Sequence, residues 1–262
     1  MPIGVEVEAR AIHPGELVVL TIALPGPAVR LDVSAFGHPV AAFRVDHRTW
    51  RALVGIDLAA SAGAHDIVID AHKEGWHATK RLQVLPHHFP SRSLSVDGAF
   101  VNPSPENEIR IEREARELQA VWRVSAPDRL WSGPFVRPVP GEANGRFGTR
   151  SVFNGQPRAP HGGADFLSGA GTPIRAPNAG RIVLARSLYF TGNTIVIDHG
   201  LGLFSLLAHL SVVDVGEGDT IAAGQVVGQV GATGRVTGPH LHWAVRVNDA
   251  RVDPLSVLAL VR

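Results

Sequence analysis

Two histidines separated by a single residue, His240 and His242, stand in the segment 237–243. The residues that follow them alternate and are β-prone, so we expect a strand here. Side chains two positions apart on a strand project from the same face. Two imidazoles on one face can share a metal ion, or one can bind the metal while the other transfers protons beside it.

A second pair of potential ligands lies upstream, where His161 precedes Asp165 by four residues. The two glycines between them disfavour a helix, and a strand also places positions i and i+4 on one side. Hydrolytic zinc sites commonly use three protein ligands and leave one position for water. We therefore expect His161, Asp165 and one histidine of the 240/242 pair to bind a metal, and the spacing does not choose between those two histidines.

Hydrolysis at such a site also needs a proton acceptor and a donor that stabilises the tetrahedral oxyanion. Bound zinc polarises a carbonyl and lowers the pKa of water to about 7. The H-E-x-x-H motif, whose glutamate acts as base in other zinc proteases, is absent from the sequence. His209 and the second histidine of the 240/242 pair are the candidates for these roles, because imidazole exchanges protons near neutral pH.

The composition limits the classes of protein to which the chain can belong. With 262 residues it is long enough for two domains. The absence of cysteine excludes disulfides and thiolate metal sites, so a metal must bind histidine and carboxylate. A formal charge of +1 and the lack of a basic cluster interleaved with aromatics argue against a nucleic-acid partner. No apolar run reaches about eighteen residues, so no transmembrane helix is expected.

The first part of the chain, residues 1–95, predicts an immunoglobulin-like β-sandwich, because short apolar or alternating runs are separated by turn residues. The strands are expected at 16–22, 30–33, 67–70 and 77–84. Eight of the thirteen histidines fall here. None has a carboxylate at a motif spacing, so we interpret them as surface or strand-end residues.

Residues 96–140 predict a linker with one amphipathic helix. Ser104 can cap the helix, Pro105 suits its first turn, and two early glutamates suit its positive end. The predicted buried stripe is Ile111, Ala115, Leu118 and Trp122. The charged residues are expected on a solvated opposite face: Arg110, Glu112, Arg113, Glu114, Arg116 and Glu117. The prolines and glycines of 127–141 then predict an extended connection.

The remaining residues, 141–262, are glycine-rich and predict strands at 180–185 and 194–198. Turns should flank a short strand at 220–221, and the glycines of 224–231 indicate close approach of neighbouring backbones. No helical period is visible, so we expect this part to be entirely β.

Six ordered segments of this C-terminal part resemble the lysostaphin-type, or LytM-type, zinc metalloendopeptidases that cleave peptidoglycan cross-links. The resemblance covers about residues 141–256 and is carried by 145–150, 161–166, 171–177, 198–202, 208–211 and 231–243. It implies an antiparallel β-sheet groove that holds one Zn²⁺ per chain.

The resemblance also implies roles for individual residues. His161, Asp165 and His242 correspond to the zinc ligands, and His209 and His240 to the catalytic pair. The family often has tyrosine two residues before the histidine of the A-H-L segment, where this chain has Leu207. That difference concerns specificity or rate and leaves the metal ligands intact.

The function that this resemblance implies is zinc-dependent hydrolysis of amide bonds in peptidoglycan stem or cross-bridge peptides, as in a D,D-endopeptidase of cell-wall remodelling. Two alternatives stay open: a catalytically silent peptidoglycan-binding or amidase-activating module, and a metallopeptidase for glycine bridges or proteins. The loop 187–191 is expected to influence which bond is cut. The N-terminal domain could position the enzyme, bind a partner or cover the groove.

Location follows from two opposing indications. The N-terminal segment 1–8 lacks the basic start and apolar core of a signal peptide, which fits a cytosolic protein or a mature fragment with an added methionine. The resemblance implies a substrate outside the cytoplasm. We therefore expect a periplasmic or secreted protein whose signal has been removed.

Several other polar or aromatic residues near these motifs are expected to be structural. His199 and Asp198 should belong to a turn, and Asp253 should form hydrogen bonds near a turn. Trp243 alternates with the histidines and is expected in the core. Arg150 could contact substrate or pack against the groove.

Overall fold

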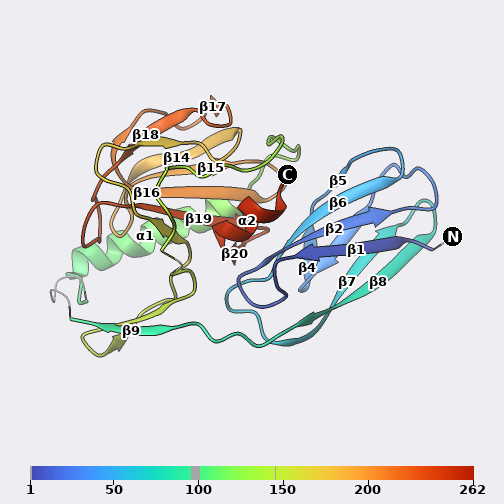
Figure 1. Cartoon of the computed structure of the whole chain (residues 1–262), viewed down its shortest axis with the longest axis horizontal. Coiled ribbons are helices and arrows are strands. Elements are labelled where there is room, and N and C mark those ends of the chain that lie inside the picture. The colour runs from blue at the N-terminus through green and yellow to red at the C-terminus, as the bar shows by residue number, and fades with distance from the viewer. Residues whose placement is uncertain (1, 96–100, 145) are drawn as a thin grey trace.

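The structure is a computed structural model that describes residues 2–95, 101–144 and 146–262. Gly145, which begins the first motif of the resemblance, and residues 96–100 of the expected linker lie outside these ranges. The fold is mainly β with antiparallel sheets, as the sequence predicts. Figure 1 shows the N-terminal strands in one lobe and most later elements in another. In the described ranges, no helix is both long and apolar enough to cross a membrane.

The N-terminal lobe contains two four-stranded antiparallel sheets. Its strands are β1 (Gly4–Ala9), β2 (Leu17–Ala23), β3 (Asp32–Ala35), β4 (His38–Val40), β5 (Ala42–Arg44), β6 (Thr49–Gly55), β7 (Gly63–Ala71) and β8 (Trp76–Val84). One sheet has the order β1-β2-β6-β5 and the other β4-β3-β7-β8, and buried side chains from both share one apolar core. The immunoglobulin-like topology stays a prediction. All eight histidines before residue 95 are exposed or half-buried, as expected.

Helix α1 (Pro105–Trp122) begins where the sequence predicts. The Ser104 hydroxyl accepts a hydrogen bond from the Asn107 N–H, and Pro105 occupies the first turn. The helix ends on Trp122, whose ring packs edge-on against Phe204 with the centroids 5.3 Å apart. This contact places α1 against one face of the C-terminal sheet.

The face that α1 buries differs from the predicted apolar stripe. Ala115 is exposed, whereas Glu114 is buried. The Glu114 carboxylate accepts hydrogen bonds from the Tyr189 N–H (2.7 Å) and the Arg110 guanidinium (2.6 Å), which replace its hydration. A carboxylate with such partners can occupy a packed face, and apolar periodicity does not reveal it.

The connection that follows α1 is extended, as expected, and it is packed into the core. Trp131, Phe135 and Val139 are all buried there. Its backbone is tied to the C-terminal sheet, because the Val136 N–H donates to the Pro177 carbonyl. The connection therefore forms part of the C-terminal core.

The C-terminal lobe is built on a nine-stranded sheet. Its strands and the neighbouring hairpin are β10 (Arg150–Phe153), β11 (Gln156–Pro157), β12 (Ala164–Phe166), β13 (Pro173–Arg175), β14 (Gly180–Leu188), β15 (Gly192–Asp198), β16 (Leu203–Val213), β17 (Thr220–Ile221), β18 (Val226–Val230), β19 (Leu241–Val247) and β20 (Ala250–Val252). The main path runs β12-β19-β16-β15-β14-β17, and β18 joins β13 to β16. As predicted, Gly228 and Gly231 lie directly against the backbone of β16.

The expectation that residues 141–262 are entirely β was wrong at the C-terminus. Helix α2 (Pro254–Leu260) has only seven residues, too few to show a helical period. The Asp253 carboxylate caps it by accepting from the Leu255 N–H, and Pro254 fills the first turn. Asp253 thus has the hydrogen-bonding role expected of it.

The two lobes meet at α2 and at the end of the sheet. Leu17 and Leu53 of the N-terminal strands belong to the same apolar core as Val257 of α2. Around this contact, Arg251 forms a two-pronged ion pair with Asp57, with atoms 2.7 and 3.1 Å apart. The interface is therefore apolar at its centre and charged at its margin.

A second connection between the lobes is the strand β9 (Ser91–Leu94), which runs along the lower edge of the molecule in Figure 1. It pairs in parallel with β10, with Ser91 opposite Arg150. Just before it, the Pro90 carbonyl accepts from the Arg150 N–H at 2.8 Å. The chain leaving the N-terminal sheets is thus bound to the segment that precedes His161.

Candidate metal centre

Two neighbouring strands carry two of the candidate residues. Asp165 on β12 stands directly opposite His242 on the antiparallel strand β19. Ala244, two positions after His242, packs with the residues beneath α1, so His242 projects from that face of the sheet. Trp243 projects from the opposite face and is completely buried in the core, as expected.

His161 lies in the loop before β12, so the expectation that it shares a strand with Asp165 was wrong. Between the two residues the chain passes close to β19 at Gly163, where a Cβ would lie 2.5 Å from the Trp243 carbonyl oxygen. Two backbone hydrogen bonds fix the loop: the His161 N–H donates to the Thr149 carbonyl, and the Gly148 N–H donates to the His161 carbonyl. The side chain of His161 still reaches Asp165.

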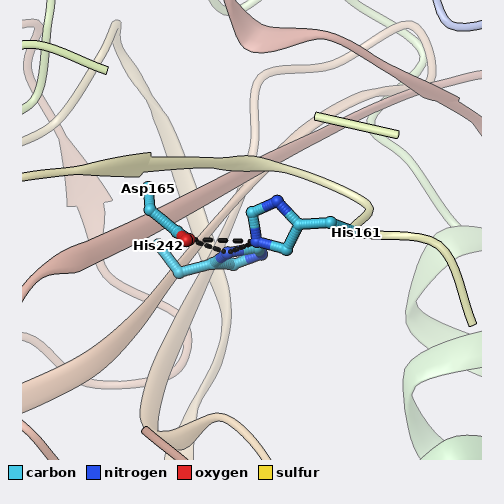
Figure 2. A group of neighbouring side chains, drawn as sticks. All are labelled: His161, Asp165 and His242. Atoms are coloured by element: carbon cyan, nitrogen blue, oxygen red, sulfur yellow. Dashed lines mark hydrogen bonds and ion pairs between the residues drawn. The ribbon is translucent and has the colours of Figure 1, made fainter. Parts of the chain in front are cut away.

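Three potential ligand atoms face one another at this place, as Figure 2 shows. His161 Nε2 lies 3.0 Å from Asp165 Oδ1 and 3.0 Å from His242 Nδ1. His242 Nδ1 lies 2.9 Å from Asp165 Oδ1. Ligands of a tetrahedral zinc ion stand about 3.3 Å apart, given bonds of about 2.0–2.1 Å. The donor triangle is therefore close to the size that such an ion needs.

The chemistry of the donors also fits a cation. His161 Nδ1 lies 3.1 Å from the Arg146 carbonyl oxygen, so Nδ1 carries the hydrogen and Nε2 presents a lone pair. Burial raises the pKa of Asp165, but the His161 and His242 rings beside its carboxylate outweigh that effect and hold the pKa well below its ordinary range. Burial lowers the pKa of His242. A carboxylate and two imidazoles thus converge, and a metal ion can bind all three.

His209 is turned toward this group by a break in the strand pairing. Asn193 pairs with Leu210 and Ile195 with Leu207, so Ala208 and His209 together oppose Thr194. His209 adopts a left-handed backbone with φ of 69°. A non-glycine residue in this region is uncommon and costs of the order of 1–3 kcal/mol. Its ring centroid lies 5.9 Å from that of His242.

The environment of His209 fixes which nitrogen faces the site. Its Nδ1 lies 2.9 Å from the Thr233 carbonyl oxygen, so Nδ1 donates and Nε2 is left with a lone pair. Burial lowers the pKa of His209 to about 4, aided by the positive charge that His242 would carry. At neutral pH the ring is therefore neutral and able to accept a proton.

His240 stands on the other side of the same group. It precedes β19 by one residue, and its Nδ1 lies 2.9 Å from the Gly238 carbonyl oxygen. Its Nε2 lies 3.7 Å from Asp165 Oδ1, and its ring centroid is 4.9 Å from that of His209. The two histidines of the 240/242 pair therefore face the same space, as the alternation predicts.

Comparison with known proteins identifies the family. The family model described as "Peptidase family M23" matches residues 159–254, which contain all five of these residues. A crystal structure of an M23 peptidase candidate from Pseudomonas aeruginosa superimposes with a TM-score of 0.76 and 36% sequence identity. The alignment covers 95% of this chain and 96% of that one. The chain belongs to peptidase family M23.

Curated relatives match the C-terminal part of this M23 peptidase. The D,D-carboxypeptidase/endopeptidase Mpg of Neisseria meningitidis is 43% identical over 97 residues, which are 37% of this chain and 22% of that protein. The peptidoglycan D,D-endopeptidase ShyA of Vibrio cholerae is 40% identical over 98 residues, 37% of this chain and 23% of that protein. The match thus spans less than a quarter of each relative's length.

Other conspicuous polar residues of the M23 peptidase have structural contacts. His199 is completely buried, and its Nδ1 and Nε2 bond to the Ala179 carbonyl and the Ser205 hydroxyl. Asp198 accepts from the Ser125 hydroxyl and from backbone N–H groups in the turn that follows β15. Leu207, two residues before His209, is buried in the core.

The sequence did not predict which groups orient the histidines of the site. They are backbone carbonyls: those of Arg146, Thr233 and Gly238 each accept from an Nδ1–H. A carbonyl leaves no side-chain signature, because every residue has one. The available signal was that all three lie in glycine-rich segments, where the chain can bend closely around another residue.

Proposed function

We propose that this chain is a zinc-dependent endopeptidase that hydrolyses amide bonds in peptidoglycan stem or cross-bridge peptides, as a D,D-endopeptidase in cell-wall remodelling. One observation carries the proposal. Three donor atoms lie 2.9–3.0 Å apart, beside two imidazoles that each keep a free Nε2. That arrangement combines the donors of a zinc site with groups for proton transfer.

In this proposal His161, Asp165 and His242 hold one zinc ion per chain. Bound there, zinc supplies a Lewis acid that polarises the scissile carbonyl and makes water a better nucleophile. The Arg146 carbonyl keeps His161 in the tautomer whose Nε2 is free to bind. Asp165 contributes the negative charge that offsets part of the cation's.

His209 and His240 carry the proton chemistry. Because each Nδ1–H is bonded to a carbonyl, Nε2 is the atom that gains and returns a proton. His209, neutral at physiological pH, accepts a proton from the attacking water. An imidazole that has gained a proton can then donate to the oxyanion or to the leaving amine.

The substrate assignment draws on the relatives, two of which are named as enzymes with D,D-endopeptidase activity. A complete donor set speaks against a silent amidase-activating module, which has no need of it. Against a peptidase for glycine bridges or proteins, the discriminating measurement is product analysis of cross-linked muropeptides. Cleavage at D-Ala–diaminopimelate and at Gly–Gly bonds leaves different fragments.

A peptidoglycan substrate places the enzyme in the periplasm or outside the cell, and we propose that location. We also propose three units along the chain. They are an immunoglobulin-like domain at 1–95, a linker with one helix at 96–140 and the metallopeptidase domain at 141–262. The part of α1 that packs against the catalytic sheet gives the linker a structural role beyond connection.

Metal analysis and muropeptide digestion test these assignments. We expect about one zinc per chain. His242→Ala should lose the zinc, and His209→Ala should keep it while losing cleavage. The matched control is His77→Ala, which removes an exposed imidazole on β8 and should change neither.

Two results would overturn the assignments. Full zinc retention by His242→Ala would refute the ligand set, and full activity of His209→Ala would refute the proton acceptor. Loss of zinc and cleavage by the control variant would mean that histidine removal acts through folding. Cleavage that survives complete removal of metal by a chelator would refute the zinc mechanism as a whole.

A further inference from the structure

Two arginines and two aromatic rings meet on loops that also contact His209, and we call them the arginine–aromatic cluster: Phe153, Arg158, Phe190 and Arg235. They come from three different segments. Phe153 ends β10, and Arg158 follows β11. Phe190 lies in the turn between β14 and β15, and Arg235 in the loop between β18 and β19.

Arg235 is held between the two rings. Its guanidinium carbon lies 4.2 Å from the Phe190 ring centroid and 5.5 Å from that of Phe153. Its backbone N–H donates to the Phe190 carbonyl at 2.9 Å. Stacking occupies the faces of a guanidinium and leaves the N–H donors in its plane free. The side chain is therefore pre-oriented.

The cluster has no negative charge to balance it. In the described ranges no carboxylate forms an ion pair with Arg235 or Arg158. Arg158 Nη2 donates to two neutral oxygens, those of the Val101 carbonyl and the Gln156 side chain, and its buried Nε has no partner. Burial and the positive charge of Arg158 both lower the pKa of Arg235. Half-buried cations without a counter-charge are costly, and an anion would offset that cost.

The cluster shares its loops with the groups that orient His209. Arg235 lies two residues after Thr233, whose carbonyl accepts from His209 Nδ1–H. Phe190, which it stacks on, precedes Thr191, whose carbonyl accepts from the His209 N–H. The same loop then continues to His240. Arg235 and Phe190 thus belong to the same two loops that orient His209.

Stem-peptide cross-links and glycine bridges differ in charge next to the scissile amide. In a D-Ala–diaminopimelate cross-link, the carbon that bears the amide nitrogen also bears a free carboxylate. A glycine bridge is neutral along its length. Guanidinium binds carboxylate through two parallel hydrogen bonds, which gives direction as well as charge.

We propose that Arg235, supported by Arg158, binds a substrate carboxylate next to the scissile amide, so that this peptidase selects anionic stem-peptide cross-links over neutral glycine bridges. The inference rests on the proposed function and deepens it. Arg235 acts here as a specificity residue that contacts substrate, and Phe190 and Phe153 hold it in place.

The test compares two purified muropeptide dimers that differ only in whether the diaminopimelate carboxylate beside the cross-link is free or amidated. For the unaltered protein loaded with zinc, kcat/KM should be at least about tenfold higher on the free acid, as loss of a charged hydrogen bond predicts. Arg235→Gln should lose that preference by reducing cleavage of the free acid only. Arg235→Lys should keep part of it. Arg116→Gln, on the exposed face of α1, is the charge-matched control and should behave as the unaltered protein.

Three results would overturn the inference or the proposed function. Equal rates of the unaltered protein on both dimers overturn the inference and leave the proposed function intact. Equal losses by Arg235→Gln on both dimers also overturn it, because Arg235 is then only structural. Failure of the unaltered, zinc-loaded protein to cleave either dimer refutes the proposed function, and the inference with it. If Arg235→Gln does not fold, the comparison of the two dimers with the unaltered protein still decides.

Discussion

Acidification from pH 7 to pH 5 should destabilise the fold, and His199 should account for a measurable part of the loss. Its Nδ1–H donates to the Ala179 carbonyl at 2.7 Å, and its Nε2 accepts from the Ser205 hydroxyl at 2.9 Å. The Ser205 oxygen in turn accepts from the Trp243 indole N–H. Both nitrogens of the neutral ring thus have hydrogen-bond partners. A second ring proton, on Nε2, would point at the hydroxyl hydrogen of Ser205 and break that hydrogen bond. Burial lowers the pKa of His199 to about 4.

The magnitude follows from the difference between the folded and unfolded states. An unfolded histidine has a pKa of about 6.5, so the unfolded chain gains a proton first as the pH falls. Above the unfolded pKa of about 6.5, the neutral ring contributes its full stabilisation of the folded state. This stabilisation is lost as the pH falls toward the folded pKa of about 4. The loss in free energy of unfolding is about 2 kcal/mol at pH 5 and about 3 kcal/mol well below pH 4.

Denaturant unfolding at pH 7 and pH 5 measures this loss. Other titrating groups contribute too, so the informative quantity is the difference between the unaltered protein and His199→Gln. The unaltered protein should lose about 2 kcal/mol more than the variant. The exposed His88→Gln serves as the control and should lose as much as the unaltered protein. Parallel losses in all three, or a His199 ring found protonated in the folded protein at pH 5 by nitrogen NMR, would refute the reasoning.

Three further outcomes are expected. Gly163→Ala should weaken zinc binding, because the added Cβ lies 2.8 Å from the His242 ring. Gly162→Ala, where an added Cβ meets no such contact, should leave the affinity unchanged. Equal zinc affinities of the two variants, measured by titration, would contradict this prediction. Glu114→Ala should lower the free energy of unfolding by about 1.5–3 kcal/mol, because Glu114 is buried and hydrogen-bonded. Glu112→Ala, at an exposed position of the same helix, should change it little. Similar effects of the two substitutions would show that the buried carboxylate does not stabilise the fold. Chelation should lower the thermal midpoint by an amount that grows with metal affinity, and an unchanged midpoint would exclude a metal that stabilises the fold.

Local patterns predicted much of the fold. The cap at Ser104 and Pro105 located the start of α1, because capping depends on residues that are adjacent in sequence. The strands near 180–185 and 194–198 were visible as apolar, β-branched runs. The buried Glu114 was missed, since its partner at Tyr189 is 75 residues away and no local pattern records it. Helix α2 was missed because it is shorter than two periods of a helical pattern.

The candidate metal centre was likewise predictable only in part. Residue types and their order pointed to His161, Asp165 and His242, and the structure brings the three together. The paths by which they meet were not predictable. His161 reaches the group from a loop, and His209 does so through a bulge with a left-handed residue. Both features depend on contacts between distant segments, which a single sequence does not display.

The parallel pairing of β9 with β10 has a consequence for the order of folding. The hydrogen bond from Arg92 to Ser151 joins residues 59 positions apart, and α1 lies between them. Closing a loop of that length costs about 3.6 kcal/mol of chain entropy before it yields any contact. The hairpin of β14 and β15 closes over three residues and can form early. We therefore expect the Arg150 amide to gain protection from pulse-labelled hydrogen exchange after the amides of that hairpin, so that the loop carrying His161 is completed late.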